Sequence, residues 1–349
     1  MKKIKWLFII GLLVNSLVSL GQSPVDSIKF FTDDKLIDMT LTTDIRKLQT
    51  EKKLEVYQPA SVTCRFPDSS IVNEDIRIYA RGHFRRENCT IPPLMLNFHN
   101  PTSPLLNQLG KLKLVIGCGT GSEDEQLILK EYLAYKTYNL LTDKSFRVRL
   151  VRVNYRDSRN KMKPFSQYAF FIEDDDDMAA RNGCVKKDDI KVTSSERTDR
   201  ATMTMVAVYE YFMSNTDWSI LNHNLKVMYD KNNEKVLPFA VAYDFDHSGL
   251  VNASYAVANE EITGTASVTE RVYRGFPRAM EELEPVFALF RKQRENINSL
   301  IMNFTLLKEK TRKETVGYLD DFYKVINNKF LQTISLHFTC NAKQKISEK

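Results

Sequence analysis

The chain has 349 residues, 43% of them hydrophobic and 27% charged, so it can bury a large core as one two-lobed domain or two small ones. This composition excludes a chain that is disordered over much of its length. The formal net charge of +6 falls to +3 without the first 21 residues, which hold three lysines and no acids, and a charge this small argues against nucleic-acid binding.

The N-terminal segment has the features of a secretory signal peptide. In residues 1–21, MKKIKWLFIIGLLVNSLVSLG, three lysines precede an apolar run, and small residues stand just before Gln22. The apolar run falls short of the roughly 20 residues that a membrane span needs, and no later segment is apolar enough to provide one. We therefore expect an exported protein (periplasmic, outer-envelope or secreted) with no transmembrane span after cleavage.

Residues 22–120 are predicted to form a β-rich N-terminal lobe. Strand-like runs with β-branched or alternating apolar residues are separated by Pro, Asn, Asp and Gly. These runs are LIDMTLTTDI, ASVTCRF, DIRIYARG, PLMLNF and KLKLVIGC. The stretch GCGTGSEDE (117–125) ends the pattern and predicts a helix start at Ser122. Its glycines are typical of a strand-to-helix turn, and a phosphate-binding loop is the alternative.

Residues 121–267 alternate between helices and strands. Apolar residues at three- to four-residue spacing predict a helix over 127–141, and DRATMTMVAVYEYFMS predicts another over 199–214. The predicted strands are SFRVRLVRVNY, SQYAFFIE, NLKVMYD and KVLPFAVAYDFD. The acidic run EDDDD (173–177) fits a solvated helix N-terminus, with a calcium site as the alternative.

The remaining residues, 268–349, are predicted to form a helical C-terminal region, with long amphipathic stretches over 268–338. A β-rich first part, a mixed middle part and a helical end predict an α+β fold with two lobes. We see no internal repeats and no low-complexity linker in this chain.

Five cysteines occur in the chain, namely Cys64, Cys89, Cys118, Cys184 and Cys340. None of them has the spacing of a zinc site, and in an exported chain they can form disulfides. An odd count leaves at least one thiol free. We expect a bridge between Cys89 and Cys118, which would tie two neighbouring N-terminal strands together.

Three carboxylates and an amide stand on segments that are otherwise apolar. Asp217 and Asn222 have the spacing D-x-x-x-x-N in DWSILN, and Asp244 and Asp246 end the segment PFAVAYDFD. Phosphoryl transfer needs hard oxygen ligands for Mg²⁺, cations on the phosphates and a carboxylate that orients the attacking hydroxyl. The pattern predicts Asp217 as catalytic base and the other three as metal ligands. Asn224 is an alternative to Asn222, and Asp246 could position the loop instead of binding the metal. The alternative is that these side chains have no catalytic role and only form hydrogen bonds with local turns and the loop backbone.

Several stretches together resemble the spore-coat protein H (CotH) family. They are IRIYARGHFRREN, KLKLVIGC, LKEYLAYKTYNLL, FRVRLVRVNY, YAFFIED, NTDWSILNHN and PFAVAYDFDHSG, and they cover about half of the chain. The resemblance implies an exported atypical kinase of two-lobed, kinase-like fold that uses Mg²⁺ and ATP to phosphorylate a hydroxyl on a protein. In this sequence Asp217 matches the catalytic aspartate, Asn222 the metal-binding asparagine and Asp244 the magnesium aspartate. Glu173 matches a further acidic position.

The sequence departs from the family at the lysine that reaches the ATP phosphates. The strand PPLMLNF (92–98) carries methionine and asparagine where that lysine is expected. Lys111 or Lys113 in the next strand, or Arg81 or Arg85, could neutralise phosphate instead. If none does, the alternative is a non-catalytic, pseudokinase-type protein that binds a partner in the envelope or has a structural role.

Two other classes of function use similar residues. A metal-dependent hydrolase or nucleotide transferase could employ the same carboxylates, because carboxylate and Mg²⁺ chemistry serves both. A serine hydrolase is disfavoured, since no G-x-S-x-G motif occurs. His223 and His247 lie in the two motif loops, where exposed histidines without a function are common.

Overall fold

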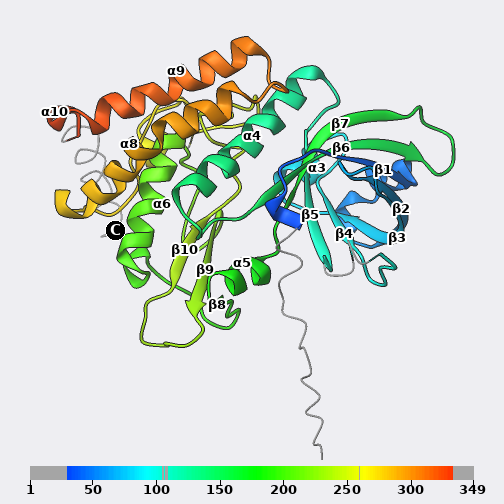
Figure 1. The fold of residues 1–349 in the computed structure, drawn as a ribbon, viewed down its shortest axis with the longest axis horizontal. Helices are drawn as coiled ribbons and strands as arrows, with labels where there is room; N and C mark the ends of the chain where they lie inside the picture. Colours follow the sequence, from blue (N-terminus) through cyan, green and yellow to red (C-terminus); the bar gives the residue numbers. More distant parts are fainter. Residues whose placement is uncertain (1–29, 104–105, 107–108, 259, 333–349) are drawn as a thin grey trace, which may run out of the picture.

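Seven strands close into a barrel in the computed structural model of the chain, which describes residues 30–103, 106, 109–258 and 260–332. Around the barrel the strands follow the order β1-β2-β3-β4-β5-β7-β6 (Figure 1). Their bounds are β1 Ile37–Thr43, β2 Gln58–Arg65, β3 Ile71–Ala80, β4 Leu94–Asn97, β5 Lys111–Ile116, β6 Val148–Asp157 and β7 Phe165–Ile172. The predicted signal peptide and Cys340 lie outside the described residues.

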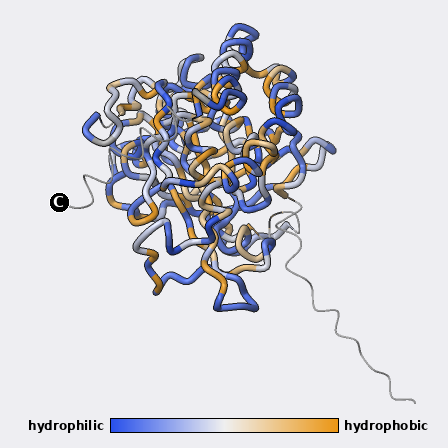
Figure 2. Tube along the Cα trace, turned by 90° about the vertical axis from the view of Figure 1, so that its left-hand side faces the viewer, coloured by the Kyte–Doolittle hydropathy of each residue, from blue (hydrophilic) through white to orange (hydrophobic). Residues whose placement is uncertain are grey.

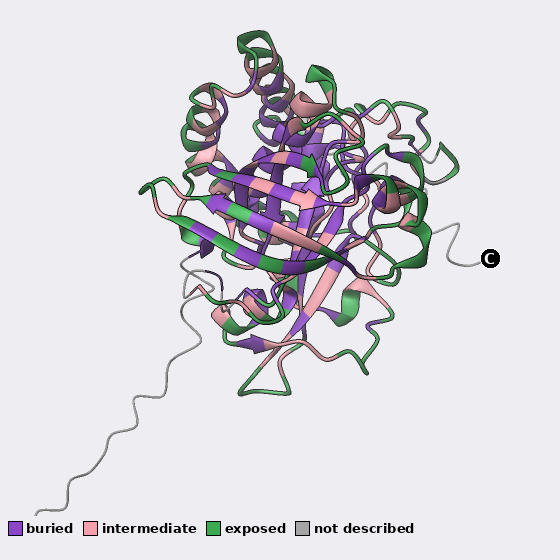
Figure 3. Cartoon of the chain, turned by 90° about the vertical axis from the view of Figure 1, so that its right-hand side faces the viewer, coloured by how far each residue is buried: buried purple, intermediate pink, exposed green. Residues whose placement is uncertain are grey.

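The barrel closes where β1 pairs in parallel with β6, which puts Ile37 opposite Val151. All other neighbouring strands in the barrel are antiparallel. Burial alternates along β1 and β3, as expected for strands with one face inside (Figure 3). Side chains such as Met39, Leu41 and Val153 fill the interior. Closure pairs both edges of every barrel strand, so none of them presents a free edge.

The predicted two-lobed, kinase-like fold is wrong. The structure is an α+β fold built on the closed mixed barrel, to which a small sheet and helices are added. The strands themselves follow the hydrophobic pattern of the sequence. The pairing of the strands does not follow from this pattern, because alternation along a strand does not reveal which strand lies beside it. Two of the barrel strands, β6 and β7, come from residues 148–172, after the long helix, and pair with β1 and β5.

Outside the barrel, helices and a three-stranded sheet in the order β10-β9-β8 enclose a second core. The longer helices are α4 Ser122–Leu141, α6 Arg200–Met213, α8 Met280–Met302 and α9 Glu309–Ile326, and the strands are β8 Cys184–Val185, β9 Leu225–Asp230 and β10 Phe239–Ala242. The short helices are α2 Ile45–Thr50, η1 Lys52–Leu54, α3 Phe84–Asn88, α5 Asp175–Arg181, η2 Ser195–Arg197, α7 Glu260–Thr263 and α10 Lys329–Gln332. None of the helices in the described residues could cross a lipid bilayer, since none is both long and apolar enough.

Helix α4 joins the barrel to the second core. On one side the rings of Tyr132 and Tyr135 lie 6.0 and 5.6 Å from the ring of Phe170 on β7. On the other side Tyr138 stacks on Tyr209 of α6 at 4.3 Å. Burial on both sides explains why this helix carries so many aromatic residues. Hydrophobic residues accordingly concentrate inside the trace and hydrophilic ones at its periphery (Figure 2).

The helices predicted over 127–141 and 199–214 are confirmed as α4 and α6. Asp199 is the N-cap of α6 and accepts a hydrogen bond from the N–H of Thr202 at 2.8 Å. The prediction of helix from 268 onward is wrong for residues 268–279, which form an irregular segment before α8. Gly275 and Pro277 lie in that segment, and both residue types disfavour a helix interior.

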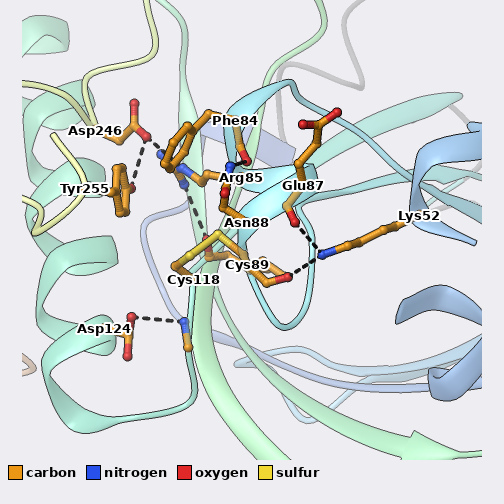
Figure 4. Close-up of a disulfide and its surroundings, with 12 residues drawn as sticks. Lys52, Phe84, Arg85, Glu87, Asn88, Cys89, Cys118, Asp124, Asp246 and Tyr255 are labelled. Atoms are coloured by element: carbon orange, nitrogen blue, oxygen red, sulfur yellow. Dashed lines mark hydrogen bonds and ion pairs between the residues drawn. A yellow bond between two sulfur atoms is a disulfide. The ribbon is translucent and has the colours of Figure 1, made fainter. Parts of the chain in front are cut away.

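The predicted disulfide between Cys89 and Cys118 is confirmed (Figure 4), but it does not tie two strands together as expected. Cys89 directly follows α3 and Cys118 lies in the loop after β5, so the bond fastens this short helix to the barrel. The N–H of Thr90 donates to the carbonyl of Cys118 at 3.1 Å and supports the same contact. Cys64 and Cys184 are buried free thiols.

The closed barrel predicts that a leucine inside it contributes more to the free energy of unfolding than an exposed leucine. Leu41→Ala on β1 should lower the free energy of unfolding by about 2–5 kcal/mol, because its side chain is fully buried in the barrel. Leu54→Ala makes the same chemical change at a side chain that is 63% exposed and should cost about 0.5 kcal/mol or less. Urea unfolding of both variants measures the difference, and equal losses would contradict the barrel.

Candidate functional site

A cavity of about 420 Å³ opens between the barrel and the helical part of the chain. Its volume is in the range of small-molecule sites. The polar side chains that line it include Arg81, Lys113, Asp217, Asn224, Asp244 and Asp246. The two cations come from the barrel side, whereas the carboxylates and the amide come from the loops around β9 and β10.

The β9–β10 hairpin brings Asn224 and Asp244 together. Ala242 pairs with Leu225 at the end of the ladder, and the N–H of Tyr243 donates to the carbonyl of Asn224 at 3.2 Å. Asp244, two residues after the end of β10, has φ +64°, and Asn224, just before β9, has φ +62°. Asparagine and aspartate are the side chains that tolerate this left-handed conformation best after glycine. Such backbone strain is typical of functional sites.

The carboxylate of Asp244 faces the cavity without a protein partner. Its backbone N–H donates to the hydroxyl of Tyr135 at 2.8 Å, but no group among the described residues donates a hydrogen bond to its side chain. Desolvation raises the pKa of this carboxyl, and the nearby charge of Asp246 raises it further, although Arg85 and Arg81 oppose the shift. A desolvated carboxylate of this kind is well suited to bind a cation.

Asp246 belongs to a buried ion network (Figure 4). The Nε of Arg85 lies 2.8 Å from one of its oxygens, and the hydroxyl of Tyr255 donates to the same oxygen at 3.1 Å. The Nη2 of Arg85 lies 2.6 Å from Glu131 on α4. One guanidinium therefore serves two buried carboxylates.

The two carboxylates of this network differ in pKa. Burial raises the pKa of Glu131 to about 8, although Arg85 opposes the shift, and its second carboxylate oxygen has no hydrogen-bond partner in the described chain. Burial also raises the pKa of Asp246, but Arg85 and His247 outweigh it, so this pKa is lowered. Asp246 therefore stays ionised and adds to the negative field at Asp244.

Asp217 stands on the loop between α6 and β9. Its N–H donates to the side-chain carbonyl of Asn215 at 3.1 Å, and its carboxylate lies 3.0 Å from Nε2 of His223. The amide of Asn224 donates to the other carboxylate oxygen at 3.1 Å. That donation leaves the amide oxygen of Asn224 free to accept or to coordinate. Asn224 thus connects Asp217 with the hairpin that carries Asp244.

Arg81 and Lys113, which line the cavity together with the paired Arg85, differ in their surroundings. Lys113 on β5 lies 2.5 Å from Asp175, which also holds Lys226 at 3.1 Å. Burial lowers the pKa of Lys113, and Asp175 opposes this. The backbone N–H of Arg81 donates to the carbonyl of Pro93 at 2.8 Å. Its guanidinium, in contrast, forms no hydrogen bond or ion pair among the described residues. Arg81 is therefore the cation best placed for an anionic ligand.

Five of the predicted site residues meet at the cavity, namely Asp217, Asp244, Asp246, Lys113 and Arg81. Asn222 and Lys111 are exposed and do not line it. Asn222 lies in a turn closed onto Ser219, and Asn224, the alternative, takes the place beside Asp217. Lys111 begins β5, one strand repeat before Lys113.

Sequence reasoning missed Glu131, Tyr135 and Tyr255. The signal for Glu131 was present, since it is an acid on the buried face of α4, four residues before Tyr135. A buried charge needs a partner, so its position called for a cation from another element. Arg85 was expected near phosphate, but it is that partner and its guanidinium is fully engaged inside the protein.

The two remaining motifs have structural roles. In GCGTG the N–H of Gly119 donates to Asp124 at 3.0 Å, so this strand-to-helix turn is filled by a side chain from α4. In EDDDD, Asp174 is the N-cap of α5, and Glu173 pairs with Arg181 at 2.8 Å. The expected helix N-terminus is confirmed, but Asp175 is buried against lysines and is not solvated.

The residues at the cavity fit a magnesium ion that is shared with a ligand. Among the described residues, no three His, Cys, Asp or Glu side chains are grouped as a preformed metal site. Mg²⁺ is commonly held by one or two carboxylates together with substrate phosphates and water. Asp244 would supply such a carboxylate and Asn224 an amide oxygen, and Arg81 would supply a positive charge for the phosphates.

Comparisons with known proteins identify no family or function for this chain. No protein-family model, no curated protein and no solved structure matches the chain. The resemblance to the CotH family therefore stays a prediction. The function must be argued from the geometry and chemistry of the cavity.

The ion network predicts a large stability effect at Arg85. Arg85→Met should lower the free energy of unfolding by about 3–5 kcal/mol, because it leaves Asp246 and Glu131 buried without their cation. Arg86→Met, next to it, removes only a pair with the largely exposed Glu55 and should cost about 1 kcal/mol or less. Guanidinium chloride unfolding compares the two, and similar losses would refute a buried network.

Proposed function

We propose that the cavity binds a magnesium–nucleotide complex and that the protein transfers a phosphoryl group from ATP to a hydroxyl. The observation that carries this proposal is the arrangement of charges around one cavity. Asp217, Asp244 and Asn224 line it from one side, and Arg81 and Lys113 line it from the other. Phosphoryl transfer depends mainly on positioning and on neutralising charge, and these side chains can do both.

Each side chain has a role in this proposal. Asp244 and the amide oxygen of Asn224 would hold the cation, and Asp246 would keep the site negative through its fixed charge. Arg81 would bind phosphate oxygens, with Lys113 as a second cation. Asp217, held by His223 and Asn224, would accept the proton of the attacking hydroxyl. The magnesium ion, when bound, neutralises negative charge on the phosphates.

The acceptor is proposed to be a hydroxyl on a protein. The side chain of Asp217 is 41% exposed, so a hydroxyl on a large molecule can reach it from solvent. The protein is proposed to be exported, which the features of residues 1–21 support. The disulfide between Cys89 and Cys118 also supports it, because disulfides persist in oxidising compartments.

A second candidate is a protein that binds the same ligand without catalysis. The specific observation in its favour is that Lys113 already pairs with Asp175 at 2.5 Å, a carboxylate that it shares with Lys226. Arg81 would then be the main phosphate contact, which suits binding better than transfer. The protein would serve as a ligand-dependent partner in the cell envelope.

Ligand binding should appear in a thermal-shift titration with Mg²⁺, with ATP and with both. Only the combination should shift the unfolding transition strongly, since a ligand at a hundredfold its dissociation constant adds about 2.7 kcal/mol. Asp244→Asn should abolish the shift, because it removes the carboxylate that binds the cation. Asp75→Asn, at an exposed acid on β3, should keep it. A shift that survives in Asp244→Asn would refute this ligand set.

The same titration, combined with γ-labelled ATP and a mixed protein acceptor, separates the two candidates. If the protein is an enzyme, Asp217→Asn should bind Mg-ATP like the wild type but transfer phosphate about 10²–10⁴-fold more slowly. If it only binds, neither protein transfers phosphate while both show the thermal shift. Loss of binding in Asp217→Asn would mean that its role here is wrong.

Cation binding should depend on pH in a defined direction. A proton and a metal ion compete for Asp244, whose raised pKa keeps the proton bound to a higher pH than in an ordinary aspartate. The affinity for Mn²⁺ should therefore rise with pH through that pKa and level off above it. Calorimetric titrations at several pH values measure this. An affinity that falls with rising pH would contradict the assignment.

A further inference from the structure

The irregular segment 268–279 lies across the C-terminal end of α6. The hydroxyl of Ser214, the C-cap of α6, lies 2.8 Å from the carbonyl oxygen of Val268 and 2.7 Å from that of Glu270, and its one hydrogen can be donated to either. The Nε of Arg271 donates to the carbonyl of Phe212 at 3.2 Å. These contacts satisfy carbonyl and hydroxyl groups where the helix ends and the loop with Asp217 begins.

Arg274, in the same segment, contacts the backbone on both sides of Asp217. Its Nη1 donates to the carbonyl of Thr216 and, at 3.1 Å, to the carbonyl of Trp218. Its guanidinium carbon lies 5.4 Å from the centre of the Trp218 ring, and Trp218 is only 5% exposed. The planar guanidinium therefore holds the peptide carbonyls of Thr216 and Trp218, one on each side of Asp217, and packs against one indole ring.

The charge of Arg274 also suits its place. It lies near the C-terminal end of α6, where the helix dipole is negative and a cation is favourable. Burial lowers the pKa of Arg274, and the charges of Asp217 and Glu210 oppose this, so the guanidinium keeps its charge beside the loop.

Asp217 depends on such support because only one of its side-chain partners, the amide of Asn224, is buried, and the rest of its side chain is open to water. Its partner His223 has a side chain that is 48% exposed, and Asp217 itself is 41% exposed. A half-exposed carboxylate that must meet a hydroxyl needs a backbone fixed from behind. In the described chain, Arg274 is the side chain that donates to both carbonyls flanking Asp217.

We propose that Arg274 is the positioning residue of Asp217. This inference rests on the proposed function, because it assigns Arg274 to the residue that would accept the proton. It gives the region after residue 267 a functional role beyond packing.

Trp218 provides a readout that does not require activity. The chain has two tryptophans, Trp6 and Trp218, so Trp6→Phe in the full chain leaves Trp218 as the single reporter. In that background, Arg274→Met should shift the indole emission to the red and increase its quenching by acrylamide. Arg274→Lys keeps the charge but not the fork of donors, and it should give a smaller change in the same direction.

Arg271→Met is the matched control. Arg271 contacts the same helix end, and its guanidinium lies 4.1 Å from the centre of the Tyr318 ring. In the described chain it forms no hydrogen bond with Thr216, Asp217 or Trp218. It should lower stability without changing the emission of Trp218. In the phosphate-transfer assay, Arg274→Met should lower kcat about 100-fold with an unchanged KM for ATP, whereas Arg271→Met should leave both unchanged.

The outcomes separate this inference from the proposed function. Unchanged emission and kcat in Arg274→Met would overturn the inference alone, and so would Arg271→Met if it reproduced the same losses. If the wild type transfers no phosphate, the proposed catalysis fails and the catalytic role of Arg274 fails with it. The fluorescence comparison then still decides whether Arg274 holds the Asp217 loop.

Discussion

The buried ion network at Arg85 is the interaction on which the site depends. It joins three elements that are distant in sequence, because Arg85 lies on α3, Glu131 on α4 and Asp246 after β10. Two carboxylates around one guanidinium are stable only if the geometry is held firmly. Gly82, with φ +86°, lets the chain turn from β3 into α3, and the disulfide at Cys89 fastens that helix to the barrel.

This network also explains the electrostatics of the cavity. Because Arg85 pairs with Asp246 and Glu131, it makes no direct contact with Asp244, whose carboxyl faces the cavity without a hydrogen-bond partner among the described residues. Arg81 at the opposite wall has no side-chain partner in the described residues. A cavity that holds a carboxyl and a guanidinium without hydrogen-bond partners among the described side chains suits a ligand that carries both a metal ion and phosphates.

The chemistry proposed here does not require the fold that was expected for it. A closed barrel supplies Arg81 and Lys113, a two-stranded hairpin supplies Asn224 and Asp244, and a loop after α6 supplies Asp217. Function belongs to such a constellation of side chains, and different folds can present the same one. The backbone supports each part separately, through the left-handed residues of the hairpin and through the segment that crosses α6.

The sequence by itself determined the local features of this protein. Alternation and spacing predicted most strands and the helices α4 and α6, and the motif pattern selected Asp217, Asp244 and Asp246. Only the tertiary structure decided which strands are neighbours, since the pairing of β1 with β6 joins segments that no periodicity connects. The tertiary structure also decided that Asn224 and Lys113 line the cavity and that Asn222 and Lys111 do not. A shift of two residues along a loop or strand is enough to move a side chain out of the cavity. Finally, the tertiary structure assigned Arg85 to the interior and Arg274 to the Asp217 loop, because ion pairs and hydrogen bonds between distant elements depend on packing that the sequence pattern does not contain.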